Sequence, residues 1–286
     1  DPAVVAFSAT THQYPYIARY AEYLKEAQPA RFALCGGTHV TLVPDQVMAN
    51  PVWDAICVGE GEHALLELVE RLQQGREYHA VRNLWVRRDG DVVRNPMRPL
   101  IENLDELPYF DRDIFDYEAL LRANHGWVDM LSGRGCPYDC SYCCNPALKQ
   151  CFRELGKYVR FRSVPPVMGE LEALDQRYTM RTINFQDDTF TLNRRWTLEF
   201  CEAYATRFKY PFWINTRVER ILDEALVQAL AKANCAGVRI GVENGDPTLR
   251  AGVLKRMTSN EEIIAAADLL HSHGIKLYTC NMIGIP

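Results

Sequence analysis

Gly135-Cys136-Pro137-Tyr138-Asp139-Cys140-Ser141-Tyr142-Cys143 places three cysteines within eight residues, and no fourth cysteine follows at matching spacing. Thiolates bind soft metal centres, and a cluster of four irons has four corners. Three protein ligands would therefore leave one iron free to bind a small molecule. This stretch, called the cluster loop below, predicts an iron-sulfur cluster with one open and catalytic iron.

The cysteines could also serve in a zinc site or in disulfides. A structural zinc site usually takes its ligands as two pairs, and the sequence has no second Cys-x2-Cys or His-x3-His. Three cysteines cannot all pair, and the ten cysteines of the chain do not have the spacing of a small secreted domain. Zinc and buried structural thiols remain the alternatives to a cluster. Cys144 is expected to pack, and so are the five cysteines far from the loop, which are interpreted as small apolar residues inside strands or helices.

The composition bounds the class of protein. The chain has 286 residues, of which 48% are hydrophobic and 24% charged, enough for one large domain or two ordinary ones. No apolar run approaches the ~20 residues of a membrane span and no signal-peptide pattern is present, so we expect a soluble, cytoplasmic protein without a membrane partner. The net charge of -5 gives no support for nucleic-acid binding. The basic segment from Lys149 to Arg162 is interpreted as a solvated loop, with contact to an anionic substrate as the alternative.

In the first part of the chain, short apolar runs alternate with amphipathic patterns. Strands are expected at 3–8, 31–35 and 54–58, and helices at 14–27, 44–50 and 62–74. This alternation predicts a parallel, doubly wound α/β domain. Ligands in such sheets bind beyond the carboxyl ends of the strands, where small and polar residues stand here. These turns are Ser8-Ala9-Thr10, Gly36-Gly37-Thr38-His39 and Gly59-Glu60-Gly61-Glu62. Each alone is also compatible with an ordinary strand-to-helix turn.

A hairpin and a linker follow. The pattern of 83–94 predicts two strands around Asp89-Gly90, and we expect this hairpin to bridge two domains. The segment from Pro96 to Tyr117 has no clear period and is expected to run over the surface as a linker. Both ends of the chain look cut, because it opens without Met on Asp1-Pro2 and closes inside an apolar run.

From Trp127 onward the alternation resumes in longer units. Strands are expected at 128–132, 182–185, 212–215, 237–242 and 276–283, with helices at 166–178, 195–208, 223–233 and 260–273. Repeated units of this size predict a full or partial parallel barrel. Catalytic residues of barrels gather where the strands end, which is where the distinctive motifs of this chain fall.

These residues resemble the radical S-adenosylmethionine (SAM) enzymes that carry an N-terminal cobalamin-binding domain. The cluster loop has the family form Cys-x3-Cys-x2-Cys with an aromatic residue, Tyr142, before the third cysteine. The resemblance implies that Cys136, Cys140 and Cys143 ligate a 4Fe-4S cluster whose open iron chelates SAM. It spans nearly the whole chain and implies a Rossmann-like domain at 1–80, a hairpin and linker at 81–122, and a partial TIM-like barrel at 123–286. Both domains are expected to be incomplete.

The later motifs resemble the SAM-binding strand ends of the same family. Phe185-Gln186-Asp187-Asp188-Thr189-Phe190 implies that Asp187 and Asp188 lie near the SAM amino group. Asn215-Thr216-Arg217 resembles the third strand end, where an arginine can bind the carboxylate through two hydrogen bonds. Glu243 would lie near the ribose and amino group, and Ile283, in Met282 to Pro286, would flank the adenine. Asp187 as a helix N-cap, Arg217 as a surface ion-pair partner and Glu243 as a solvated carboxylate remain alternatives.

The N-terminal turns resemble cobalamin-binding domains, whose glycines accommodate the nucleotide tail. The residues implied are Ser8, Thr10, Gly36, Gly37, Thr38, Gly59, Glu60 and Gly61. Many such domains carry an Asp-x-His-x-x-Gly motif whose histidine ligates cobalt, and nothing in this chain matches it. His39 is therefore assigned a hydrogen bond that stabilises its turn.

The resemblance implies reductive cleavage of SAM to a 5′-deoxyadenosyl radical, followed by cobalamin-dependent methyl transfer to an unactivated carbon or phosphinate phosphorus. The implied partners are a small-molecule or peptide substrate and a low-potential electron donor such as a flavodoxin or ferredoxin. A radical cyclase or rearrangement enzyme of the same group is the alternative within enzymes. A non-catalytic cobalamin-binding or metal-sensing module is the alternative from another class.

Overall fold

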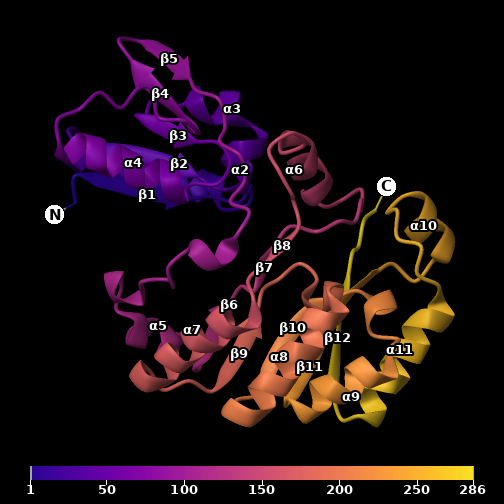
Figure 1. Cartoon of the computed structure of the whole chain (residues 1–286). Coiled ribbons are helices and arrows are strands. Elements are labelled where there is room, and N and C mark those ends of the chain that lie inside the picture. The colour runs from indigo at the N-terminus through magenta and orange to yellow at the C-terminus, as the bar shows by residue number, and fades with distance from the viewer. Residues whose placement is uncertain (1, 286) are drawn as a thin grey trace. The chain divides into compact units, whose positions relative to one another are not determined.

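The computed structural model describes residues 2–285; Asp1, and Pro286 at the end of the predicted fifth-strand motif, lie outside the described residues. The chain divides into two compact units, which are described separately. The first unit comprises Asp1–Glu102 and Pro146–Tyr158, and the second comprises Asn103–Asn145 and Val159–Pro286 (Figure 1). The segment Pro146–Tyr158 thus belongs to the first unit, although the residues on both sides of it in the sequence belong to the second.

The first unit is built on a five-stranded sheet whose strands lie in sequence order. Its strands are β1 (Val4–Ser8), β2 (Phe32–Gly36), β3 (Ala55–Cys57), β4 (Leu84–Arg88) and β5 (Asp91–Arg94). The first three are parallel, and β4 and β5 are antiparallel to their neighbours. Consecutive residues of β2 face opposite sides, because Leu34 and Cys35 belong to different apolar clusters.

Helices cover both faces of this sheet, as a doubly wound domain requires. The helices are α1 (Tyr14–Ala27), α2 (Thr38–Leu42), α3 (Pro44–Met48) and α4 (Glu62–Gln73). Ala18 and Ala21 of α1 pack with Cys35 on one face, while Ala64 and Leu68 of α4 pack on the other. The doubly wound prediction is confirmed, and the short helix α2 is an element that the sequence pattern did not indicate.

The hairpin extends the first sheet, where the sequence had suggested a bridge between domains. Ala55 of β3 pairs with Val86 of β4 in antiparallel register. The turn residues Asp89 and Gly90 have φ values of 50° and 89°, as a two-residue hairpin turn needs. The predicted turn at Asp89-Gly90 is thus confirmed, but the hairpin belongs to the first sheet and does not bridge two domains. The functional boundaries at 1–80, 81–122 and 123–286 stay predictions.

A helix that follows the cluster loop belongs to the first unit. The helix α6 (Asn145–Cys151) leads into a turn that ends near Tyr158. Leu148 and Phe152 form an apolar cluster with Leu100, and Met97 packs against it. The chain thus leaves the second unit after Asn145, two residues beyond the last loop cysteine, and returns to it at Val159. Basic residues in this segment, such as Lys149, suggest a solvated loop, so the sequence pattern did not predict the helix.

The second unit holds a five-stranded parallel sheet, also in sequence order. Its strands are β6 (Trp127–Met130), β9 (Thr182–Phe185), β10 (Phe212–Thr216), β11 (Cys235–Glu243) and β12 (Lys276–Asn281). The helices are α5 (Tyr117–Ala123), α7 (Val164–Arg177), α8 (Arg194–Arg207), α9 (Glu224–Lys232), α10 (Pro247–Gly252) and α11 (Asn260–Ser272). Short pieces complete it: η1 (Leu104–Glu106), η2 (Arg112–Ile114), β7 (Gly133–Arg134), β8 (Arg160–Phe161), η3 (Phe190–Leu192) and η4 (Val218–Arg220). Successive parallel strands joined through helices form a partial barrel, as predicted.

The two faces of this sheet differ in polarity because side chains alternate along each strand. On the helix-covered face, Phe185 and Phe212 meet Phe200 of α8, with ring centroids 5.2 Å and 5.6 Å away. On the other face, Asn184 donates to Asp129 at 2.6 Å and accepts from Arg239 at 2.7 Å. Burial of the aromatic face fixes the register of the strands, and this register places the polar side chains together on the opposite face.

A buried ion triad fastens the linker to α7. The carboxylate of Glu170, whose side chain is 2% exposed, pairs with Arg112 at 3.0 Å and with Arg162 at 2.6 Å. Arg112 also lies over the rings of Phe110 and Tyr117. The C-terminal end of the basic segment is therefore buried in an ion pair, which corrects the interpretation of 149–162 as a wholly solvated loop.

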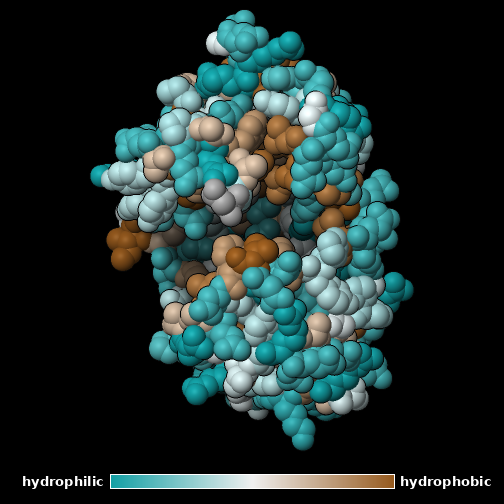
Figure 2. Space-filling model, turned by 90° about the vertical axis from the view of Figure 1, so that its left-hand side faces the viewer, coloured by the Kyte–Doolittle hydropathy of each residue, from teal (hydrophilic) through white to brown (hydrophobic). Residues whose placement is uncertain are grey.

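The surface seen in Figure 2 is mainly hydrophilic, with hydrophobic residues gathered in patches. Across residues 2–285, no helix combines the length and the apolar character needed to span a bilayer.

Candidate active site

The cluster loop follows β6 and β7, beyond the carboxyl end of the sheet in the second unit. Cys136 and Cys140 are 9% and 7% exposed, and Cys143 is half-buried. Gly135 has a φ of 81°, which turns the chain into the loop. Among residues 2–285, no three His, Cys, Asp or Glu side chains lie close enough together to bind a single metal ion, the arrangement that a zinc site would require.

Hydrogen bonds hold the loop from several sides. The Ser141 amide and hydroxyl donate to the carbonyls of Leu254 and Val253, at 3.3 Å and 2.6 Å. The Cys143 amide donates to the Cys140 carbonyl at 3.1 Å. The loop is thus tied to the segment between α10 and α11, which lies more than a hundred residues further along the chain.

The thiols differ in acidity. Burial raises the pKa of Cys136. The pKa of Cys143 is lowered to about 5 because the Cys144 thiol hydrogen-bonds to its sulfur, and the amide of Asn145 donates as well. Cys144 itself is exposed, in contrast to the packing role expected for it. A thiol with a low pKa is a thiolate at neutral pH, the form that binds metal.

Asp187 and Asp188 anchor the two ends of the loop. The buried Asp187 carboxylate accepts from the hydroxyl of Ser132 at 2.7 Å and from its amide, just before β7. Asp188 accepts from the Asn145 side chain at 3.2 Å, two residues after Cys143. Burial raises the pKa of Asp187 to about 6. Both predicted residues therefore lie beside the loop, and their carboxylates bond to protein groups.

Arg217 stands at the end of β10 with its charge already paired. Its guanidinium lies 3.2 Å from the Cys140 sulfur, 3.8 Å from the centre of the Tyr138 ring, and in an ion pair with Glu219. Asn215 on the same strand donates from its side chain to the carbonyls of Phe185 and Asp187, at 3.3 Å and 3.2 Å. Arg217 thus contacts the loop, as its position in the sequence suggested.

Arg256 is a second arginine at the loop, and sequence reasoning missed it. It is 5% exposed and donates to the Gly241 carbonyl at 2.6 Å and the Tyr142 hydroxyl at 3.0 Å. One of its nitrogens lies 3.8 Å from the Cys140 sulfur. Its buried Nε has no hydrogen-bond partner within the described residues, and no ion pair in that part of the chain involves it. No motif surrounds Arg256, so only the fold could reveal it.

Glu243 and Tyr142 complete this wall of the site. The Tyr142 hydroxyl donates to the Glu243 carboxylate at 2.8 Å. Glu243 is 8% exposed and has a φ of 67°, a conformation that is uncommon for residues with a side chain and that gathers at functional sites. A Cβ on Gly241 would lie 2.0 Å from the Glu243 carboxylate, so a side chain there would displace that carboxylate. Ile283, in contrast, is fully exposed and packs against nothing described.

In the first unit, the turns after β1 and β2 interlock. The Ala9 amide donates to the Gly36 carbonyl at 2.9 Å, and the His39 amide donates to the Ala9 carbonyl at 3.1 Å. Gly37 has a φ of 98°, and a Cβ on it would lie 2.6 Å from the Ala9 nitrogen. The ends of these strands, with the exposed residues Ser8, Thr10 and Thr38, form one surface.

The turn after β3 is held by other polar groups. Gly59 has a φ of 93°, and the Asn83 side chain donates to the Glu60 carbonyl at 2.8 Å. The Glu60 carboxylate accepts from the Ile101 amide at 2.8 Å, and Gly61 precedes the first turn of α4. Glu60 thus binds backbone of its own unit, so the glycines are the better candidates to meet a ligand.

His39 forms the local bonds expected of a turn residue. Its Nδ1 lies 3.1 Å from the Thr11 hydroxyl, and its ring centre lies 4.5 Å from that of Tyr14. Burial lowers its pKa.

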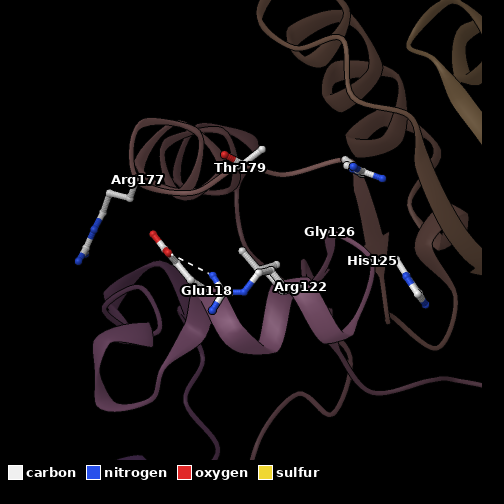
Figure 3. A pocket seen from close by; sticks show the side chains of 8 residues that line it. Glu118, Arg122, His125, Gly126, Arg177 and Thr179 are labelled. Atoms are coloured by element: carbon white, nitrogen blue, oxygen red, sulfur yellow. Dashed lines mark hydrogen bonds and ion pairs between the residues drawn. The ribbon is translucent and has the colours of Figure 1, made fainter.

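A cavity of about 530 Å³ lies at the opposite end of the second sheet (Figure 3). It is lined by α5, the turn before β6 and the loop that joins α7 to β9, that is, at the amino ends of the strands. Glu118 pairs with Arg122 at 3.5 Å, while Arg177 and His125 project to different sides in Figure 3. The basic groups do not converge on one point, so we do not assign the chemistry to this cavity.

An open, three-thiol loop at the carboxyl end of a partial barrel, with a Rossmann-like sheet in the same chain, defines a cluster-binding α/β enzyme. Residues 130–286 match the model of the radical SAM superfamily, and residues 1–69 match that of the B12 binding domain. The chain therefore belongs to the radical SAM superfamily, in the group that binds cobalamin. A 4Fe-4S cluster, SAM and cobalamin are the cofactors of this group.

The chain is similar to both methyltransferases and cyclases. An uncharacterized methyltransferase of Pyrococcus horikoshii is 30% identical over 266 residues, 93% of this chain and 57% of that protein. An anaerobic magnesium-protoporphyrin IX monomethyl ester cyclase of Rubrivivax gelatinosus is 32% identical over 284 residues, 96% of this chain and 49% of that protein. The chain thus spans about half the length of these curated relatives.

The same fold occurs in solved structures. The radical SAM methyltransferase TsrM from Kitasatospora setae superposes with a TM-score of 0.80 at 19% identity, over 100% of this chain and 58% of that chain. Similarity at this level of identity shows the shared fold.

Proposed function

We propose that this chain is the cofactor-binding part of a cobalamin-dependent radical SAM methyltransferase that acts on an unactivated carbon or a phosphinate phosphorus. The observation that carries the proposal is the three-thiol loop beside a buried, incompletely paired arginine. The Rossmann-like unit with its glycine turns supports cobalamin as the methyl carrier. Similarity to a cyclase keeps radical cyclisation as the second candidate.

The residues at the loop suit the cofactors that the group uses. Cys136, Cys140 and Cys143 supply three soft ligands, and the buried Arg256 Nε needs an acceptor that the described residues do not provide. When bound, the cluster and SAM supply a carbon radical, and cobalamin supplies the methyl group. The protein holds the substrate close to the radical and excludes water. A small-molecule or peptide substrate, a low-potential electron donor and a cytoplasmic location are parts of the proposal.

The partners of the two arginines favour one of them as the group that binds the SAM carboxylate. The charge of Arg217 is already paired with Glu219 and covered by the Tyr138 ring. Arg256 donates to a carbonyl, a hydroxyl and the Cys140 sulfur, and its buried Nε has no hydrogen-bond partner among the described residues. A carboxylate accepts well from such a guanidinium. We therefore assign the carboxylate to Arg256, in place of the Arg217 assignment that the sequence suggested.

An isotope experiment distinguishes methyl transfer from cyclisation. The full-length, cluster-loaded protein is incubated anaerobically with cobalamin, a low-potential reductant and SAM deuterated in its methyl group. A methyltransferase passes the label into product and also forms 5′-deoxyadenosine. Product without label, alongside 5′-deoxyadenosine, would establish the cyclase alternative, and absence of SAM cleavage in a fully loaded protein would refute the radical assignment.

Replacing Arg256 with Gln is expected to weaken SAM binding about tenfold or more, because the positive partner of the carboxylate is lost. Affinity is measured by the change in the cluster's electron paramagnetic resonance signal as SAM is added, so turnover is not needed. SAM without its carboxylate should bind equally to the wild type and Arg256→Gln. Arg217→Gln is the matched comparison and should retain the preference for the carboxylate. The reverse pattern would return the role to Arg217.

A further inference from the structure

Thr41 joins the two glycine turns of the first unit. It is 5% exposed and lies on the short helix α2, between the turn after β2 and the turn after β3. Its hydroxyl donates to the Gly37 carbonyl at 3.0 Å and accepts from the Gly59 amide at 3.0 Å. A single hydroxyl therefore donates one hydrogen bond and accepts another, and the two bonds go to the backbones that follow two different strands.

Both turns depend on backbone conformations that only glycine adopts readily. Gly37 and Gly59 have φ values of 98° and 93°. A Cβ on Gly59 would come within 3.2 Å of the Asn83 side chain and the Met97 sulfur. Glycine has no side chain that could hold either turn in place. The distance between the two turns therefore depends on neighbouring groups.

Other hydrogen bonds hold each turn against a different neighbour. The turn at Gly37 is bound to the turn after β1 through Ala9, and the residue before Gly59 is bound to Asn83. Within residues 2–285, the Thr41 hydroxyl bridges the Gly37 carbonyl and the Gly59 amide.

We propose that Thr41 is a positioning residue for cobalamin, which sets the separation of the two glycine turns and so the fit of the nucleotide arm of the corrinoid. Thr41 is not among the residues assigned to cobalamin above, and its role rests on the proposed binding of cobalamin. Glycine turns at the carboxyl ends of neighbouring parallel strands are where the backbone can approach a bulky ligand closely. A change in their separation alters every contact that depends on both.

The test compares Thr41→Val, which keeps the shape and removes the hydroxyl, with Thr41→Ser, which keeps the hydroxyl. Each full-chain variant is titrated with hydroxocobalamin and with cobinamide, a corrinoid without the nucleotide arm, and the absorbance change gives the affinity. We expect Thr41→Val to bind hydroxocobalamin about tenfold more weakly than the wild type, the loss typical of one such hydrogen bond. Thr41→Ser should restore it, and cobinamide should bind to all three alike.

Leu68→Val is the control for stability, because Leu68 is buried against the opposite face of the sheet and touches neither turn. It should lower the thermal midpoint without changing hydroxocobalamin affinity. An unchanged affinity in Thr41→Val, an equal loss for cobinamide, or failure of Thr41→Ser to restore binding would overturn the proposal. Absence of hydroxocobalamin binding by the wild type would instead overturn the cobalamin assignment on which the proposal stands.

Discussion

Replacing Cys140 with Ala is expected to abolish the proposed cleavage of SAM to 5′-deoxyadenosine, and the same result is expected at Cys136 and Cys143. The cause is loss of the cluster, since two thiolates do not hold a cube that needs three protein ligands. Cys140 is buried, and its sulfur lies 3.2 Å from the Arg217 guanidinium. Iron and sulfide per chain, measured after anaerobic reconstitution, should fall well below about four.

The matched control for the loop is Cys144→Ser. Cys144 is exposed and adjacent to a ligand, and serine keeps a hydroxyl that can donate to the Cys143 sulfur. This variant should keep full iron content and SAM cleavage. If Cys144→Ser lost the cluster as completely as Cys140→Ala, the site would have four protein ligands and no open iron, and the proposed chemistry would fail.

Replacing Glu170 with Gln is expected to lower the free energy of unfolding by about 3 to 5 kcal/mol. The neutral amide leaves the guanidinium groups of Arg112 and Arg162, whose side chains are 11% and 13% exposed, without their counter-ion. Arginine keeps its proton, so the unpaired charges cannot be neutralised in place. Urea unfolding followed by circular dichroism gives the difference.

Glu172→Gln on the same helix is the control. Glu172 pairs with Arg207, and both side chains are about half exposed, at 47% and 49%. Water screens such a pair, so its loss should change the free energy of unfolding by about 1 kcal/mol or less. Equal changes in the free energy of unfolding at the two positions would show that the buried triad contributes no more to stability than the exposed pair.

Periodicity predicted most elements because burial imposes it. The strand at 182–185 was located to the residue, since Ile183 and Phe185 face a continuous apolar layer. The helix α6 was missed because Lys149 and Gln150, which suggest solvent, stand between the anchoring residues Leu148 and Phe152. Its apolar partners Met97 and Leu100 lie some fifty positions earlier, beyond the reach of any local pattern.

For the site, the sequence located the loop but not the full set of groups around it. Spacing identified the three cysteines, because metal ligation constrains spacing. It could not tell whether the carboxylate of Asp187 faces a ligand or the Ser132 backbone, since both uses place Asp at a strand end. Arg256 stands in a loop without any motif, and its role depends on its contacts with Tyr142 and Gly241.

Because α6 packs in the first unit, the two units cannot be separated by a single cut in the sequence. A fragment that ends at Glu102 would lack Leu148 and Phe152, so Leu100 and Met97 would face water. A fragment that begins at Asn103 would carry the same helix without the surface on which it rests. Exchange of the cobalamin-binding half between relatives therefore requires three junctions, after Glu102, Asn145 and Tyr158, where a simple two-domain chain would require one.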